Sequence, residues 1–159
     1  MKTNLFIFYF VIFNAIPVFA GNVINDYYFI SSDLNAVEWV NDNTIVVAGD
    51  DGTLMRSTDA GLNWDQRYSG TDLDINDLCK TGENLLLAAG EKGLIMKSGF
   101  NAASWQFIKT DINSNLNAIK SIGSDLVIAA GDNGTVLKSI NSFETYDEIN
   151  FGYNVNLQD

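Results

Sequence analysis

The sequence has no histidine and a single cysteine among its 159 residues. Without histidine, the nucleophile systems that pair serine or cysteine with an imidazole base lack that base, and zinc sites lack their usual nitrogen ligand. The lone Cys79 excludes an internal disulfide framework. These absences exclude the commonest hydrolase sites and zinc centres. We expect no catalytic residue, no metal and no cofactor in this chain.

Basic residues are also scarce. Nine lysines and arginines stand against 20 acidic residues, which gives a net charge of −11. Binding to nucleic acid requires cations that neutralise phosphates, and anionic membrane surfaces attract basic segments in the same way. The charge balance therefore excludes nucleic acid as a partner and disfavours a membrane surface. It leaves a protein, or a glycan, as the expected class of partner.

A long apolar run is absent except near the N-terminus, where Leu5 to Phe13 follows the positively charged Lys2. This run is too short to span a bilayer, and the segment Val18 to Ala20 forms a cleavage site. We predict that residues 1–20 are a secretory signal peptide. The chain is then secreted or periplasmic and starts at Gly21. The cleavage point has no cysteine, so lipid attachment is not indicated.

What the sequence does contain is an internal repeat. Gly49, Gly90 and Gly131 stand 41 positions apart. Three further columns of residues keep the same step: Gly52, Gly93 and Gly134; Ser57, Ser98 and Ser139; Trp64, Trp105 and Tyr146. A period of this size is typical of one supersecondary unit copied in tandem.

Each copy predicts four short strands. An apolar pair opens the copy, a polar break follows, and a run of β-forming residues such as Leu85 to Ala89 ends at the first glycine. The paired glycines, as in Gly49 and Gly52, are expected to supply the positive φ that a tight hairpin needs. Two more strands follow. We therefore predict an all-β chain of three β-propeller-type blades, each with four antiparallel strands.

The repeat also divides the chain. We expect a leading outer strand in residues 21–33, blades in residues 34–74, 75–115 and 116–156, and the start of a truncated fourth repeat in residues 157–159. Propellers close with about four to eight blades. We therefore favour a piece of a larger propeller. The alternative is a ring completed by self-association of two copies.

The turn between the third and fourth strands carries the most specific motif. Ser57 to Trp64 reads Ser-x-Asp-x-Gly-x-Asn-Trp, which closely resembles the Asp-box of BNR repeats. Asp59 can fix such a turn by bonding its own backbone, Gly61 takes the left-handed conformation, and the ring of Trp64 covers the hairpin. The other copies keep less of the motif: Ser98 and Trp105 in the second; Ser139 and Tyr146, with Asn141 at the acidic position, in the third.

The run from Gly49 to Asp59 resembles one branch of these propellers, the photosystem II assembly and stability factor type, which also occurs in secreted bacterial proteins. The resemblance covers Leu34 to Tyr146. It implies a propeller that binds or assembles other proteins, and it carries no catalytic residues over. BNR repeats also occur in sialidases, which clamp a carboxylate with three arginines, whereas this chain has only Arg56 and Arg67.

Residues that recur with the repeat are predicted to be structural, so contact sites are sought among residues that break it. Trp39, Tyr68, Phe107 and Tyr153 are the aromatic candidates for a surface contact. The column of Glu38, Cys79 and Lys120 mixes an acid, a thiol and a base. We expect this column to face solvent or a blade edge.

One stretch matches part of a calcium-binding loop. Asp72, Asp74 and Asn76 are followed by Glu83 at the twelfth position. Asp77 stands where that loop needs a glycine, and the repeat places the stretch in a strand. We therefore expect no calcium here.

The sequence as a whole predicts a secreted, non-enzymatic propeller segment that acts as a protein-binding or complex-assembly scaffold. The alternative is the repeat portion of a secreted carbohydrate-active hydrolase, sialidase-like or glycosidase-like, whose catalytic residues lie outside this chain. A photosystem assembly factor in the strict sense is a third option.

Overall fold

The structure is a computed structural model that describes residues 31–82, 85–99 and 101–151. The chain divides at Ser31/Ser32 into two units, and the description below concerns the second, Ser32–Asp159. The expectations for the signal peptide, for residues 21–30, for Glu83 and Tyr153, and for residues 157–159 lie outside the described residues. No helix in the described ranges is long and apolar enough to cross a membrane.

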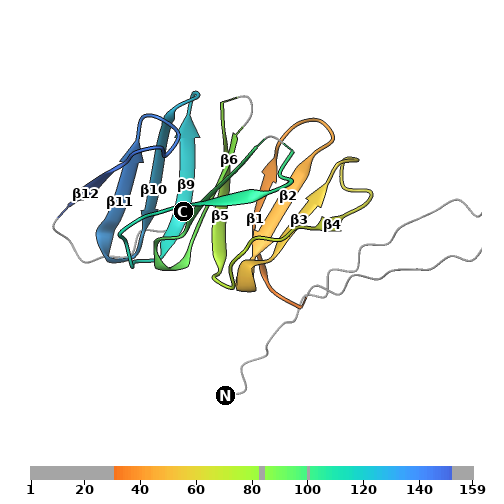
Figure 1. Cartoon of the computed structure of the whole chain (residues 1–159), viewed down its shortest axis with the longest axis horizontal. Helices are drawn as coiled ribbons and strands as arrows, with labels where there is room; N and C mark the ends of the chain where they lie inside the picture. Colours follow the sequence, from red (N-terminus) through yellow and green to blue (C-terminus); the bar gives the residue numbers. More distant parts are fainter. Residues whose placement is uncertain (1–30, 83–84, 100, 152–159) are drawn as a thin grey trace, which may run out of the picture. The chain divides into compact units, whose positions relative to one another are not determined.

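The second unit consists of three four-stranded antiparallel sheets, each built from consecutive strands (Figure 1). Sheet 1 contains β1 (Leu34–Trp39), β2 (Ile45–Gly49), β3 (Leu54–Ser57) and β4 (Asp65–Gln66). Sheet 2 contains β5 (Ile75–Thr81), β6 (Leu85–Gly90), β7 (Ile95–Gly99) and β8 (Trp105–Ile108). Sheet 3 contains β9 (Leu116–Ile122), β10 (Leu126–Gly131), β11 (Thr135–Ser139) and β12 (Asp147–Asn150). The predicted all-β architecture of four-stranded units is confirmed.

A short 3-10 turn joins the second and third strands of every sheet. These turns are η1 (Asp50–Gly52), η2 (Glu91–Gly93) and η3 (Asp132–Gly134). The second glycine of each pair has the positive φ expected of it, 66° at Gly52, and the residue before it also does, 53° at Asp51. Glycine adopts this conformation without steric cost.

The first glycine of each pair is required for a different reason. Gly49 has a φ of −170°, an extended conformation open to any residue. A β-carbon there would overlap the carbonyl oxygen of Asp33, which accepts a hydrogen bond from the Asp50 N–H at 2.9 Å. The expectation of positive φ at this glycine is therefore wrong, because close approach of the entering chain is what excludes a side chain. Gly90 and Gly131 repeat the arrangement.

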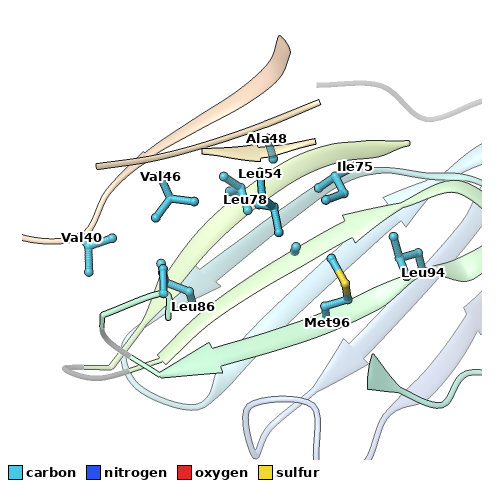
Figure 2. Packing of buried hydrophobic residues seen from close by; sticks show 11 residues of the cluster. Val40, Val46, Ala48, Leu54, Ile75, Leu78, Leu86, Leu94 and Met96 are labelled. Carbon is cyan, nitrogen blue, oxygen red and sulfur yellow. The ribbon is translucent and has the colours of Figure 1, made fainter. Parts of the chain in front are cut away.

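Apolar side chains fill the space between neighbouring sheets. Between sheets 1 and 2, Val46 and Leu54 pack with Leu78 and Met96, all at most 2% exposed (Figure 2). A second cluster between sheets 2 and 3 includes Leu87, Ile95, Leu116, Ile119, Val127 and Leu137. Full burial of one such side chain stabilises a fold by about 1.5–3 kcal/mol. The core therefore lies between the sheets, and each sheet depends on its neighbour.

Cys79 lies in the second cluster and is only 4% exposed, so the expectation that it faces solvent or a blade edge is wrong. Sheet 2 has a neighbour on each face. Ile75 and Leu78 of β5 pack toward sheet 1, whereas Cys79 packs toward sheet 3. Burial, which disfavours the thiolate, raises the pKa of the Cys79 thiol to about 12.

Candidate functional site

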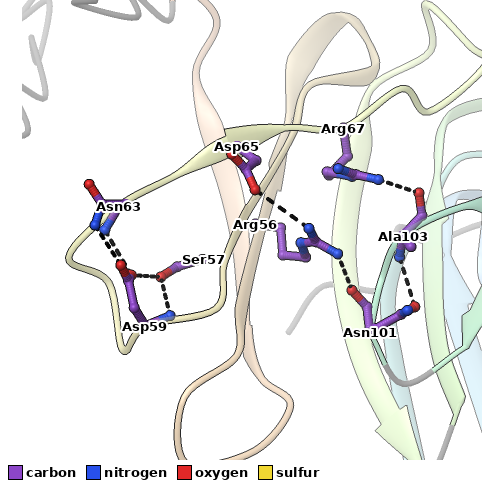
Figure 3. Close-up of polar contacts among 8 residues, drawn as sticks. All are labelled: Arg56, Ser57, Asp59, Asn63, Asp65, Arg67, Asn101 and Ala103. Carbon is purple, nitrogen blue, oxygen red and sulfur yellow. Dashed lines mark hydrogen bonds and ion pairs between the residues drawn. The ribbon is translucent and has the colours of Figure 1, made fainter. Parts of the chain in front are cut away.

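The turn between β3 and β4, residues 57–64, is held together by its own side chains (Figure 3). Ser57 Oγ accepts a hydrogen bond from the Gly61 N–H at 2.8 Å and donates one to Asp59 Oδ1 at 2.9 Å. The same Asp59 oxygen accepts the Asn63 N–H at 2.8 Å. The Trp64 indole N–H donates to the Gly61 carbonyl at 3.0 Å. Hydrogen bonds from Asn63, above all from its side-chain amide, lower the pKa of the Asp59 carboxyl.

The equivalent turn of sheet 3, residues 139–146, keeps this arrangement with different residues. The Phe143 N–H donates to Ser139 Oγ at 2.9 Å, and the Thr145 N–H donates to Asn141 Oδ1 at 3.0 Å. Phe143 stands in the column of Gly61 and has a φ of 64°, which is uncommon for a bulky residue. Its ring is 1% exposed, and its centroid lies 6.2 Å from that of Tyr146. Burial of the ring offsets the strained backbone, a role that the motif alone did not reveal.

The equivalent turn of sheet 2 is built differently. Ser98 Oγ donates to the Ser104 carbonyl at 2.6 Å, and the side chain of Trp105 packs against the cluster between sheets 1 and 2. The serine and the aromatic ring of this copy therefore still contact the loop and the core.

Arg56 of β3 and Arg67, which follows β4, reach residues 101–103 in the turn between β7 and β8 (Figure 3). Arg56 Nη1 donates to the Asn101 carbonyl at 2.8 Å, and Arg67 Nη2 donates to the Ala103 carbonyl at 2.7 Å. Arg56 also lies 3.5 Å from the carboxylate of Asp65. Both guanidinium groups thus tie sheet 1 to sheet 2, which is a different use from the carboxylate clamp of a sialidase.

A row of polar side chains crosses the first strands of the three sheets. Asp77 in β5 accepts the Ile119 N–H at 2.8 Å and lies 3.0 Å from Lys120 Nζ, both in β9. Glu38 in β1 is half-buried, and its pKa is raised, chiefly by loss of solvent, although Lys120 and Lys80 oppose the rise. A carboxyl with a raised pKa is a candidate acid or base. The contacts of Asp77, however, run from sheet 2 to sheet 3, as expected of a structural junction.

The stretch that resembled a calcium loop is occupied by structural contacts. Asp74 Oδ1 accepts the Asp51 N–H at 2.9 Å, and Asn76 Nδ2 in β5 donates to the Leu116 carbonyl at 2.9 Å. In the part of the chain that the structure describes, no group of three or more acidic, cysteine or histidine residues is placed to hold a metal ion.

Two of the aromatic residues that break the repeat come together. Tyr68 follows β4 and is 88% exposed, and Phe107 lies in β8 and is 54% exposed. Both rings lie beside Gly70, where a β-carbon would be 3.2 Å from Phe107 Cε2 and 3.8 Å from Tyr68 Cε1. We call Tyr68, Gly70 and Phe107 the aromatic surface. Trp39 is exposed on β1.

Known proteins share the arrangement of the sheets, although no family model and no curated protein matches the sequence. A structure of YCF48 bound to a D1 peptide has a TM-score of 0.64 and 18% identity over 74% of this chain and 40% of that chain. YCF48 from Cyanidioschyzon merolae has a TM-score of 0.64 and 13% identity over 74% of this chain and 39% of that chain. The three sheets are β-propeller blades.

An ancestral GH74 enzyme is a further structural match, with a TM-score of 0.57 and 22% identity over 81% of this chain and 19% of that chain. The chain therefore spans about two fifths of the length of YCF48 and one fifth of the GH74 enzyme. YCF48 is a photosystem II assembly factor with a propeller fold, so the resemblance stated from the repeat is confirmed at the level of fold.

Proposed function

We propose that this chain is an exported propeller-type scaffold that binds a segment of another protein. The observation that carries the proposal is the aromatic surface of Tyr68, Gly70 and Phe107. Exposed aromatic rings are enriched at protein–protein interfaces, where they supply large contact areas at low entropic cost. Neither Tyr68 nor Phe107 recurs with the repeat, so the blade fold does not by itself require them.

The partner segment is expected to be neutral or basic. The chain has a net charge of −11, and opposite charge speeds and orients association, whereas like charge opposes it. Gly70 lies beside both rings and has no side chain, so the backbone of a bound segment can approach closely there. An extended segment that presents apolar side chains fits this description, and the D1 peptide bound to YCF48 is the first probe to test.

The experiment measures binding of the D1 peptide and of a displayed library of random peptides by the purified chain. We expect selected peptides to be neutral or basic and to lose affinity by about tenfold or more in the Tyr68→Ala/Phe107→Ala double variant, because the contact area is removed. Leu62→Ala is the matched control, since Leu62 is 69% exposed but lies in the β3–β4 turn. Equal affinity of the selected peptides for the natural chain and for the double variant would contradict the proposal.

The second candidate is the repeat portion of a carbohydrate-active hydrolase. It is favoured by the likeness to a GH74 enzyme and by the fact that aromatic faces also stack on sugars. A glycan array probed with the same three proteins distinguishes the two. Glycan binding that depends on Tyr68 and Phe107, without peptide binding, would favour the hydrolase portion over the protein scaffold.

Export is part of the proposal and has its own test. Expression in a bacterial host with the natural N-terminus, followed by intact mass measurement of the exported protein, is expected to give a chain that starts at Gly21. An uncleaved chain that stays in the cytoplasm would contradict export. It would not affect the binding proposal, which the peptide experiment tests separately.

A further inference from the structure

The outer edges of the three sheets differ in length and in charge. The first strands, β1, β5 and β9, lie beside one another, so β4, β8 and β12 form the opposite edges of their sheets. An edge strand presents backbone groups that can pair with another chain, and short strands or charged side chains protect such an edge. β4 has two residues, and β12 carries the exposed Asp147 and Glu148. β8 has four residues, Trp105–Ile108, and none of them is charged.

The hydrogen-bond pattern of the sheets shows which backbone groups of β8 point outward. In an antiparallel sheet, successive residues of a strand direct their N–H and C=O groups to opposite sides. In sheet 1 the Arg67 N–H donates to the Leu54 carbonyl at 2.8 Å. The equivalent residues of sheet 2 are Ile108 and Ile95, which are partners in the β7–β8 register. Ile108 therefore bonds β7, and the N–H and C=O of the preceding Phe107 point away from the sheet.

The pairing of β6 with β7 gives the same direction. The Gly90 N–H donates to the Leu94 carbonyl at 3.0 Å, so the next hydrogen-bonded pair between these strands, two residues along, is Ala88 with Met96. Met96 thus uses its backbone groups toward β6 and leaves Phe107, its register partner in β8, without a bond from β7. Among the described residues no further strand of sheet 2 lies on the outer side of β8.

The ring of Phe107 lies on the face of β8 that is turned toward sheet 1. Side chains alternate between the two faces of a strand. Trp105 packs against the cluster between sheets 1 and 2, and Ile108 packs against the cluster between sheets 2 and 3, so Phe107 shares the face of Trp105. Gly70 lies beside its ring there. The open backbone edge and the aromatic surface therefore meet at Phe107.

We propose that the partner segment binds as an added strand on β8, an inference that rests on the proposed function. The segment exchanges backbone hydrogen bonds with the N–H and C=O of Phe107, in the manner of extended peptides that join an exposed sheet edge. The segment residue opposite Phe107 lies on the same face as its ring, beside Gly70 and Tyr68. We expect that residue to be apolar, since the aromatic surface is what it contacts.

Charge selects the chemistry of the same segment. The chain has a net charge of −11. Near the edge, Arg67 is bonded to the turn between β7 and β8, and Lys109 is paired with Asp111 at 3.7 Å. Asp72 is exposed and makes no hydrogen bond or ion pair with another described residue. A segment with a lysine or arginine beside its apolar residue is therefore complementary to this edge.

The first experiment compares two substitutions of one residue in the full-length chain, with the peptides that the natural chain selects from the displayed library as probes. Phe107→Ala removes the ring and keeps the backbone N–H, whereas Phe107→Pro removes both. Proline is tolerated at an edge position whose N–H faces solvent. We expect the proline variant to bind about tenfold more weakly than the alanine variant, because the hydrogen bond to the segment is lost. Equal affinities of the two variants would overturn the added strand.

Gln66→Pro is the matched control, because Gln66 occupies the equivalent outward position in β4. It should bind the selected peptides as the natural chain does. A loss of affinity in Gln66→Pro equal to that in Phe107→Pro would show that proline acts through the fold, and it would remove the support for β8. Circular dichroism establishes that each variant is folded, and if Phe107→Pro is not, the peptide experiment below decides.

The second experiment leaves the protein unchanged and alters the peptide. A selected peptide is methylated at one backbone nitrogen at a time, which removes one N–H donor in each case. Only alternate N–H groups of an added strand face β8, so affinity should fall by about tenfold or more at every second position of the pairing stretch. Losses without this two-residue period, as expected of a bound helix or a polyproline segment, would overturn the added strand.

Failure of the added strand is distinguishable from failure of the proposed function. Selected peptides that bind the Tyr68→Ala/Phe107→Ala variant as tightly as the natural chain, or a chain that selects no peptide, would contradict the proposed function and the added strand together. Weaker binding by that variant, with equal alanine and proline variants and no two-residue period, would overturn the added strand alone.

Discussion

At the scale of the residue, equivalent positions of the repeat differ in exposure and in pKa because their surroundings differ. Cys79 and Lys120 occupy one repeat column, yet Cys79 is 4% exposed and the Lys120 side chain is 60% exposed. Glu38, in the same column, is half-buried with a raised pKa. The difference comes from the neighbouring sheet, which covers one position and leaves another in solvent.

The thiol of Cys79 is expected to be unreactive in the folded chain. Its pKa is raised to about 12, and thiolate is the reactive form. Alkylation by iodoacetamide at mildly alkaline pH, followed by mass spectrometry, should be at least about 100-fold slower in the native chain than in urea. Equal rates in the two conditions would show that the junction between sheets 2 and 3 opens readily.

Phe143 is expected to stabilise the fold despite its left-handed backbone. Phe143→Ala removes a ring that is 1% exposed and should lower the free energy of unfolding by about 3–5 kcal/mol. Phe143→Gly loses the same ring but relieves the positive φ, so it should cost about 1–2 kcal/mol less than the alanine variant. Urea unfolding of the three proteins checks this, and an alanine variant more stable than the glycine variant would contradict it.

At the scale of the element, the turns between the third and fourth strands of sheets 1 and 3 share a hydrogen-bonding scheme although their residues differ. In the turn of residues 57–64 the acceptor for the later N–H is the carboxylate of Asp59, and in residues 139–146 it is the amide oxygen of Asn141. The scheme needs an oxygen at this position and does not need a charge. The glycine of this turn, Gly61, is likewise replaced by Phe143 in sheet 3, where the phenylalanine ring is buried in the core.

Asp59→Asn is therefore expected to keep the turn and to change its response to acid. Hydrogen bonds from Asn63 lower the pKa of Asp59 below its ordinary value of 3.8. A lowered pKa contributes stability that is present above pH 3.8 and lost as the pH falls through the folded-state value. Thermal unfolding should show a shallower loss of stability in acid for the variant than for the natural chain, with similar midpoints at neutral pH. Parallel acid profiles would contradict this.

At the scale of the whole molecule, the blades are joined by polar contacts as well as by the core. Asp77 accepts the Leu78 N–H at 2.9 Å within β5, accepts the Ile119 N–H at 2.8 Å in β9, and pairs with Lys120. Arg56 and Arg67 make the corresponding link from sheet 1 to sheet 2. The sheets are thus linked in series, and we expect each junction to contribute its own stability.

Asp77→Ala is expected to loosen one junction selectively. It leaves the Ile119 N–H without its acceptor, which costs about 1–3 kcal/mol for a buried group. Native-state hydrogen exchange should speed up in β9 and β10 and change little in β2 and β3. Asp111→Ala is the control, because its pairing with Lys109 is 88–89% exposed and such pairs contribute little. Uniform acceleration in all three sheets would contradict independent junctions.

Much of the architecture was predictable from the repeat. The recurring glycines, serines and aromatic residues located the turns, and the apolar runs located the strands, because turn chemistry and short runs of β-forming residues are local properties. Of the candidate contact residues, Tyr68 and Phe107 were found because they break the repeat. That they meet at Gly70 was not predictable, since they belong to different blades.

The sequence by itself determined the four-stranded antiparallel unit, its number of copies and the excess of negative charge. Only the tertiary structure decided which face of each sheet is covered. It buried Cys79, left Val37 and Ile128 exposed, and assigned Gly49 to a close approach of the chain instead of a positive φ. The physical reason is that both faces of a blade are apolar in sequence, and burial depends on what lies beside them in space.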